Sequence, residues 1–318
     1  MNKLIIFCRN AVETLTYFSM QMERSFAAWG YETFWMDFDQ LGLSTWKLRQ
    51  AAKENEAVLI TFNFIGLSGE EELWDFDEEG NPDRSIWEKL GILCLNIMVD
   101  HPIYYYKALR HPVSRLYTFC IDRDHTAYMK RFYPGIPCAF LPLAGNLGET
   151  TEYRKGKNTA SEQQNILTEA VDCGAERNSA SAEKDVWAEE SESQQMIQVQ
   201  ENYEEWINRP YELVFTANYV PVSGIEKQLG KLEPEYRDFY YEMIDAFIKN
   251  PSQNLLSGME MYMRREMPDL TDSQLCEAMS TTPAVDLRVR TYFREQTVRE
   301  LAEGGRPRHL FGRDWAKS

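Results

Sequence analysis

The sequence lacks the short motifs by which many enzymes are recognised. It contains no GxGxxG, no GxxxxGK[ST], no HExxH and no GxSxG motif, and no cysteine or histidine spacing typical of a zinc site. These absences argue against a nicotinamide dehydrogenase, a nucleoside triphosphatase and a serine hydrolase. We therefore expect the chain to hold no metal and no resident cofactor.

Basic clusters and long apolar runs are missing as well. The chain carries 34 Lys and Arg against 50 Asp and Glu, and it gathers no cluster of cations for a nucleic acid or an anionic membrane surface. Its apolar runs are far shorter than the roughly 18 residues of a membrane helix, and the first, at 4–8, is too short for a signal peptide. Six cysteines without a CxxC pair are typical of reduced thiols. We expect a cytoplasmic protein without nucleic-acid partners or membrane insertion.

Residues 1–150 do contain a regular alternation of apolar runs and helical periodicities. This alternation predicts an α/β domain, a Rossmann-like parallel sheet with helices on both faces. The acidic stretch 68–82 is expected to form a loop. The predicted strands are 4–8, 33–38, 57–64, 92–99, 116–121 and 138–143.

Two further segments follow this first domain. Residues 151–205 are rich in Glu, Gln, Ser, Ala and Asn, and we expect an acidic low-complexity linker there. Residues 206–318 are expected to start a second Rossmann-like domain, which contains only two apolar strands and therefore looks incomplete. A helical insertion separates those strands. The predicted strands are 212–220 and 308–311, and the predicted helices are 235–249, 255–265, 271–279 and 285–303.

Polar or flexible residues stand where the predicted strands end. Ligands of open α/β sheets bind beyond the carboxyl ends of the strands. These residues are therefore the first candidates for a ligand site. They are Asn63, Asp100, His101, Asp122, Gly145 and Asn218.

Asp100 and His101 have two interpretations, and the sequence favours neither. An Asp beside a His at the mouth of a sheet could form a general base that removes a proton from an acceptor hydroxyl. Pro102, however, suits the first position of a helix, so either residue could instead cap the exposed N–H groups of that helix. For Asp122, which precedes the helical pattern 123–130, capping is the favoured interpretation.

The predicted helix 285–303 carries Arg290 and Arg294 on its apolar face, where charges need partners. A diphosphate is one candidate partner, because arginine binds phosphate oxygens through two parallel hydrogen bonds. An ion pair with a carboxylate at the domain interface is the favoured alternative. Thr216 and Asn218 could line a turn near such a phosphate.

Six pieces of the chain together resemble the bacterial glycosyltransferase-like proteins of the spore-maturation CgeB type. Their order and spacing carry the resemblance, which spans nearly the whole chain except 151–205. The pieces are VDHP at 99–102, FCID at 119–122 with His125, LPLAG at 141–145, FTANY at 215–219, DLRVR at 286–290 and FGRDW at 311–315.

This resemblance implies a GT-B arrangement, in which two Rossmann-like domains face each other across a cleft and no metal is obligatory. The complete protein would transfer a sugar from a nucleotide-sugar donor to a surface, spore-coat or flagellar-type acceptor, which is a glycan or a protein. The first domain would mainly contact the acceptor and the second mainly the donor. The implied roles are catalysis for Asp100 and His101, acceptor contact for Asn63, Asp122 and Gly145, and donor-phosphate contact for Thr216, Asn218, Arg290 and Arg294.

Relatives of this type continue well past the segment similar to FGRDW, and their donor-binding strands lie in that continuation. We therefore expect this chain to be a truncated form or part of a split enzyme, missing its C-terminal half and inactive alone. The alternative is a non-catalytic glycan- or protein-binding scaffold of α/β fold.

Overall fold

A computed structural model describes residues 2–9, 12–76, 78–79, 82–143, 214–304 and 309–311. The chain forms two compact units. The first contains residues 1–145 together with 220–295, and the second contains 146–219 together with 296–318. The predicted linker 151–205 lies outside the described residues, and so does Gly145.

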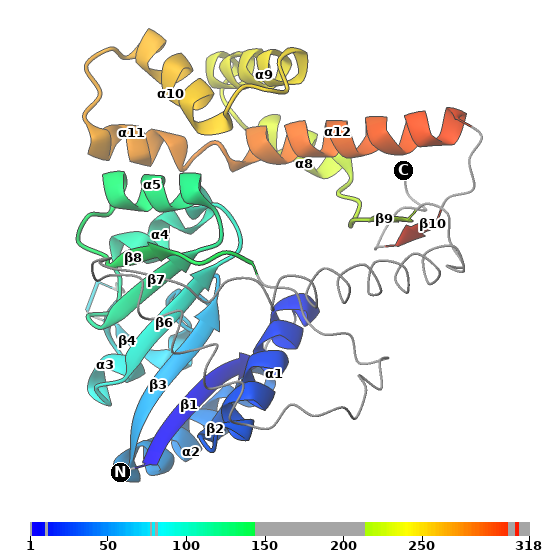
Figure 1. Cartoon of the computed structure of the whole chain (residues 1–318). Helices are drawn as coiled ribbons and strands as arrows, with labels where there is room; N and C mark the ends of the chain where they lie inside the picture. Colours follow the sequence, from blue (N-terminus) through cyan, green and yellow to red (C-terminus); the bar gives the residue numbers. More distant parts are fainter. Residues whose placement is uncertain are drawn as a thin grey trace, which may run out of the picture. The chain divides into compact units, whose positions relative to one another are not determined.

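The first unit is built on a six-stranded parallel sheet with strand order β2-β1-β3-β6-β7-β8, as expected for a Rossmann-like domain (Figure 1). All six strands predicted for this sheet are present, with ends within about three residues of those expected. The strands are β1 (Asn2–Arg9), β2 (Glu32–Asp37), β3 (Asn55–Phe62), β6 (Leu93–Met98), β7 (Leu116–Cys120) and β8 (Cys138–Phe140).

Successive side chains of β1 point to opposite faces of the sheet, and both sets are apolar. Leu4 and Ile6 belong to one buried core, whereas Ile5 and Phe7 belong to a second core on the other face. A strand that is buried on both faces must be apolar throughout, and this is why the central strands of the sheet stand out as continuous apolar runs in the sequence.

Helices cover these two cores and return the chain from one parallel strand to the next. Leu15 of α1 packs into the core that contains Ile5, and Leu48 of α2 packs into the core that contains Ile6. Gly30 has a φ of +84°, so it ends the first helix as a left-handed residue. The helices and 3₁₀ turns of this part are α1 (Glu13–Ala28), η1 (Phe38–Gln40), α2 (Leu41–Glu54), α3 (Ile86–Lys89), η3 (Pro102–Tyr105), α4 (Tyr106–Arg110) and α5 (Arg123–Phe132).

The acidic stretch after β3 is more ordered than predicted. The expectation of a loop throughout 68–82 was wrong, because the 3₁₀ turn η2 (Glu71–Leu73) leads into an antiparallel hairpin of β4 (Trp74–Phe76) and β5 (Pro82–Ser85). Trp74 is only 8% exposed, so the hairpin has an apolar anchor in the core. The acidic side chains of Asp75 and Asp83 are exposed. Because acidic residues surround Trp74 in the sequence, the segment was predicted as a loop and not as a hairpin.

The helices of the C-terminal segment belong mostly to the first unit. Residues 220–295 pack against η3 and α5, where Ile103 and Tyr128 join the helical core. This grouping differs from the division expected from the sequence, which assigned these helices to the second domain; α8 was not anticipated. The helices are α8 (Val222–Leu229), α9 (Pro234–Lys249), α10 (Leu255–Glu266), α11 (Asp272–Met279) and α12 (Pro283–Glu303).

Arg131 of α5 links the sheet part of the unit to these helices through four hydrogen bonds. Its guanidinium binds both carboxylate oxygens of Glu260, at 2.7 and 2.9 Å, and both oxygens of Asp272, at 2.8 and 3.0 Å. Two fork-like pairs on one arginine fix the orientation of α10 and α11 relative to α5.

The second unit contains β9 (Val214–Thr216) and β10 (His309–Phe311), which pair in parallel as the two strands predicted at 212–220 and 308–311. The described part of β9 is shorter than its prediction. Among the described residues, no helix combines the length and the apolar character needed to cross a membrane.

Candidate functional site

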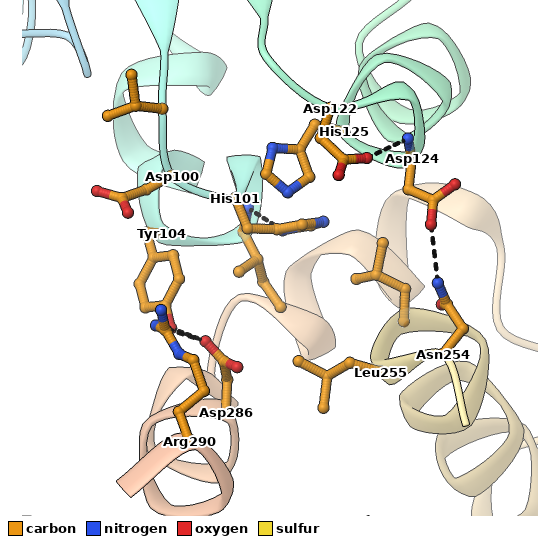
Figure 2. A pocket seen from close by; sticks show the side chains of 13 residues that line it. Asp100, His101, Tyr104, Asp122, Asp124, His125, Asn254, Leu255, Asp286 and Arg290 are labelled. Atoms are coloured by element: carbon orange, nitrogen blue, oxygen red, sulfur yellow. Dashed lines mark hydrogen bonds and ion pairs between the residues drawn. The ribbon is translucent and has the colours of Figure 1, made fainter. Parts of the chain in front are cut away.

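A hollow of about 290 Å³ lies beyond the carboxyl ends of β6 and β7, within the first unit (Figure 2). We call it the acidic hollow. Five elements supply its polar side chains: the end of β6, η3, the start of α5, the start of α10, and α12. Its polar and charged lining residues are Asp100, His101, Tyr104, Asp122, Asp124, His125, Asn254, Asp286 and Arg290.

Asp100 is held in place by Asn63, which follows β3. The side-chain amide of Asn63 donates to Asp100 Oδ2 at 2.9 Å, and its oxygen accepts from the backbone N–H groups of Val99 at 2.9 Å and Asp100 at 3.3 Å. Tyr105 also donates to Asp100 Oδ2, at 3.3 Å. Asn63 is buried and does not line the hollow, so its contribution is to position Asp100.

The turn that presents Asn63 has an unusual backbone. Asn63 and Phe64 have φ values of +49° and +60°, a left-handed conformation that a bulky side chain such as that of Phe64 rarely adopts. The buried side chain of Asn96 stabilises this turn, because its Oδ1 accepts from the Phe64 N–H at 2.9 Å. Two asparagines thus fix the turn: one within it and one on the neighbouring strand.

His101 caps the η3 turn. Its Nδ1 accepts from the Ile103 N–H at 3.0 Å, and Pro102 occupies the first position of the turn, so the capping alternative describes the observed hydrogen bond. Because Nδ1 is an acceptor, the proton of the neutral ring sits on Nε2. Burial lowers the pKa of His101 to about 3, with a smaller contribution from His125. Asp100 forms its side-chain hydrogen bonds with Asn63 and Tyr105, and none joins it to His101 in the described part of the chain.

The His101 ring packs in an aromatic cluster at the floor of the acidic hollow. It meets His125 edge-on at 4.6 Å between ring centroids and Tyr128 at 5.0 Å. Burial also lowers the pKa of His125. His101 Nε2 and His125 Nδ1 are buried, and neither has a hydrogen-bond partner in the described part of the chain. Both imidazoles are therefore neutral at pH 7, and each leaves one nitrogen unsatisfied.

Asp122 and Asp124 place two carboxylates at the start of α5. Asp122 is the N-cap of this helix, as favoured from the sequence, and accepts from the Asp124 N–H at 2.6 Å. The Asp124 carboxylate accepts from the side-chain amide of Asn254 at 3.0 Å. Both carboxylates are exposed at the edge of the hollow, and Figure 2 shows the hydrogen bond between Asp124 and Asn254.

Arg290 has protein partners on the opposite wall. It forms an ion pair with Asp286 at 2.7 Å, one helical turn away, and donates to the Tyr104 hydroxyl at 2.6 Å. Tyr104 donates in turn to Asp286, and burial together with this carboxylate raises the pKa of Tyr104. Arg290 thus forms an ion pair, as the favoured interpretation expected, but its carboxylate lies on the same helix and not at a domain interface.

The charge of the acidic hollow decides which ligands suit it. Four carboxylates line it, and the only cationic side chain among its lining residues is Arg290, which is already paired. An anionic diphosphate would be repelled by the unpaired carboxylates. Carboxylates and an amide accept hydrogen bonds from hydroxyl or amino groups, so a polyhydroxylated or cationic ligand matches this lining. The described residues contain no group of His, Cys, Asp or Glu arranged to hold a metal ion.

The remaining predicted site residues are not among those lining this hollow. Arg294 lies one turn further along α12, whereas Thr216 and Asn218 belong to the second unit. Gly145 falls outside the described residues. Asp124, Asn254 and Asp286 were not among the predicted site residues; the spacing of four residues between Asp286 and Arg290 was the available signal.

No protein-family model matches the chain, and searches of curated proteins and of solved structures found no significant match.

Proposed function

We propose that the sheet domain binds a polyhydroxylated acceptor, a glycan or a glycosylated protein, in the acidic hollow and acts as the acceptor half of a GT-B type glycosyltransferase. The observation that carries the proposal is the set of four carboxylates, an amide and an arginine around one hollow at the carboxyl edge of a Rossmann-like sheet. Carboxylates accept hydrogen bonds from sugar hydroxyls, and the amide and the guanidinium donate to them. The edge of the sheet is where ligands of this fold class bind.

Asp100 is the general base in this proposal. Its carboxylate is exposed at the hollow and is oriented by Asn63 and Tyr105, so it can accept a proton from an acceptor hydroxyl. His101 is a positioning residue. Its pKa of about 3 makes it a poor base at neutral pH, and its Nδ1 is committed to the Ile103 N–H.

The donor contacts belong to the second domain in this proposal. Thr216 and Asn218 are the candidates there, and a nucleotide sugar is the expected donor substrate. Arg290 and Arg294 are assigned to the acceptor wall and to α12, because the carboxylates near Arg290 disfavour a diphosphate.

A binding protein without transfer activity is the second candidate. The charges that line the acidic hollow favour it, since the hollow offers four carboxylates but no unpaired cation for a donor diphosphate. In this case Asp100 would bind a hydroxyl group and no proton would be transferred.

Titration calorimetry distinguishes these ideas. The chain would be titrated with neutral mono- and oligosaccharides, amino sugars and uridine diphosphate, and each mixture would then be incubated with a nucleotide sugar and analysed by mass spectrometry. We expect saccharide binding that Asp286→Asn weakens and that Asp245→Asn, a matched change on the exposed face of α9, leaves unchanged. Binding of uridine diphosphate alone in the hollow would contradict the acceptor proposal.

Asp100→Asn separates transfer from binding. Transfer that is lost in this variant while saccharide affinity changes less than about threefold supports the general base, because the amide keeps the shape but cannot accept the proton. Saccharide affinity that Asp100→Asn weakens as strongly as Asp286→Asn does supports the binding protein, because Asp100 would then be a binding contact and not a base.

A further inference from the structure

A second hollow of about 350 Å³ is lined by α4 and by the chain after β3, and its charge is opposite to that of the first. We call it the basic hollow. The loop that follows β3 forms one wall with residues 67–69, the hairpin contributes Trp74, and α4 forms the other wall. Tyr106, Lys107 and Arg110 of α4 line the basic hollow, together with His111, which follows the helix.

The basic hollow gathers cations in a chain whose net charge is -16. Lys107 and Arg110 are three residues apart, which places these two cations on one side of α4, and His111 follows directly after the helix. No Asp or Glu is among the lining residues, and no ion pair joins these three side chains to a carboxylate in the described part of the chain. This local charge favours an anionic ligand.

Arg110 is held in a fixed position before any ligand arrives. Its guanidinium donates to the Tyr106 hydroxyl at 3.1 Å and lies 5.6 Å from the centre of the same ring. A cation that is already oriented loses less conformational entropy when it binds an anion. The Tyr106 ring also leaves an aromatic face beside the charge.

The opposite wall is equally rigid. Glu70 accepts from the backbone N–H groups of Gly66 at 2.8 Å and Ser68 at 3.1 Å, so its carboxylate is occupied within the loop. The Gly66 carbonyl accepts from the indole of Trp87 at 2.7 Å. Trp74 is 8% exposed, and its indole Nε1 has no hydrogen-bond partner in the part of the chain that the structure describes.

We propose that the basic hollow binds a small phosphate monoester. The phosphate group would contact Lys107 and Arg110, and the sugar or base ring of the ester would lie against Trp74 and Tyr106. Cations and hydroxyls suit a dianionic phosphate, and aromatic faces suit a sugar or base ring. The volume lies within the range of about 300–1,000 Å³ that is typical of small-ligand sites. This site is independent of the acidic hollow and of the acceptor proposed there.

The structural alternative is that these cations only stabilise the end of α4, since positive charge near a helix C-terminus is favourable. That role predicts an effect on stability and none on phosphate affinity. The two roles are therefore separable by experiment.

The test is a heteronuclear NMR titration of the full chain with sodium phosphate, glucose 6-phosphate, uridine 5′-monophosphate and glucose. We expect the two esters to shift the Trp74 indole signal and the amides of α4, whereas glucose does not. Lys107→Gln/Arg110→Gln should weaken ester binding at least about tenfold. Lys47→Gln/Arg49→Gln, a matched pair on the exposed surface of α2, should change it less than about twofold.

Tyr106→Phe is a second variant that keeps the charge and the ring but removes the hydroxyl that holds Arg110. It should give an intermediate loss of affinity at an unchanged melting temperature. Esters that shift none of these signals, or equal weakening in both double variants, would overturn the proposal. Inorganic phosphate that binds as tightly as the esters would overturn the part assigned to the aromatic rings. Glucose 6-phosphate and uridine 5′-monophosphate, compared with each other, identify a sugar or a nucleoside as the preferred ring.

Discussion

Asn63 and Asp100 are 37 residues apart in the chain, yet the side chain of the first holds both the backbone and the carboxylate of the second. The Nδ2–Oδ2 distance is 2.9 Å, and the backbone N–H of Asp100 lies 3.3 Å from the Asn63 oxygen. The ends of β3 and β6 are therefore joined by a side chain as well as by the sheet. Asp100 faces the acidic hollow in one orientation because of this pair.

Replacement of Asn63 should destabilise the fold and the site together. Asn63→Ala removes three hydrogen bonds and leaves the half-buried N–H groups of Val99 and Asp100 without this acceptor, so we expect a loss of about 2–3 kcal/mol in the free energy of unfolding. Asn63→Gly loses the same bonds but accepts the φ of +49° without strain, and it should be about 1 kcal/mol more stable than the alanine variant. Urea denaturation of both variants measures the two effects. Equal stability of the two would show that the turn carries no strain.

The buried imidazoles should make stability depend on pH in the weakly acidic range. His101 has a folded-state pKa of about 3, well below the ordinary value, and burial lowers that of His125 too. Below about pH 6.5 the unfolded state therefore binds more protons, and stability should fall with pH by at most about 1.4 kcal/mol per pH unit and histidine. Above that pH the contribution is fully present.

Urea denaturation at pH 7.5, 6 and 5 checks this dependence. His101→Asn/His125→Asn should give a flatter profile, since asparagine can still cap η3 but does not titrate. His111→Asn, at an exposed histidine, should retain the slope of the unchanged chain. A double variant with the original slope would contradict the assignment.

The two bidentate ion pairs of Arg131, with Glu260 and Asp272, should make the packing of α10 and α11 against α5 sensitive to strong acid. Hydrogen bonds from Arg131 lower the pKa of Glu260 to about 2 and also lower that of Asp272. Their stabilising contribution is present above the ordinary carboxyl pKa and is lost as the pH falls towards 2. Melting temperatures between pH 6 and pH 2.5 should show this loss. Glu260→Gln should reduce the acid-induced change, and Glu277→Gln, an exposed glutamate on α11, should not.

Gly258 of α10 lies close against the side chain of Phe247 of α9. A methyl group there would lie 2.7 Å from Cζ of Phe247 and closer still to its Cε1, and Phe247 is only 2% exposed. Gly258→Ala should therefore cost about 1–3 kcal/mol by overpacking. Gly42→Ala, whose methyl group would meet no atom within 4 Å, should leave the melting temperature unchanged or raise it slightly. Equal effects of the two substitutions would contradict the close packing.

The strands of the sheet were predictable because each is a local apolar run, and their ends correctly singled out Asn63, Asp100, His101 and Asp122 as polar residues at one edge. The left-handed conformation of Phe64 had no such local signal, because phenylalanine is not a residue that favours it. The hairpin after β3 was hidden by its acidic side chains, since its apolar anchor is a single residue, Trp74.

The grouping of the C-terminal helices with the sheet depends on contacts between distant parts of the chain. The Tyr128 hydroxyl lies 3.5 Å from Sγ of Cys276, 148 residues later, and Tyr104 donates to Asp286, 182 residues later. Periodicity describes which face of a helix is apolar but not which surface will cover it. The sequence therefore predicted the side of the acidic hollow that the strand ends form, but not the side that α10 and α12 form.

The left-handed turn at Asn63 and Phe64 has a consequence for the order in which the chain takes shape. Its partners, Asn96 and the backbone at Val99 and Asp100, leave the ribosome more than thirty residues after the turn itself. During synthesis the turn therefore has no side chain or backbone group to hold it in this conformation. The first wall of the acidic hollow becomes fixed only when β6 has been made and has joined β3.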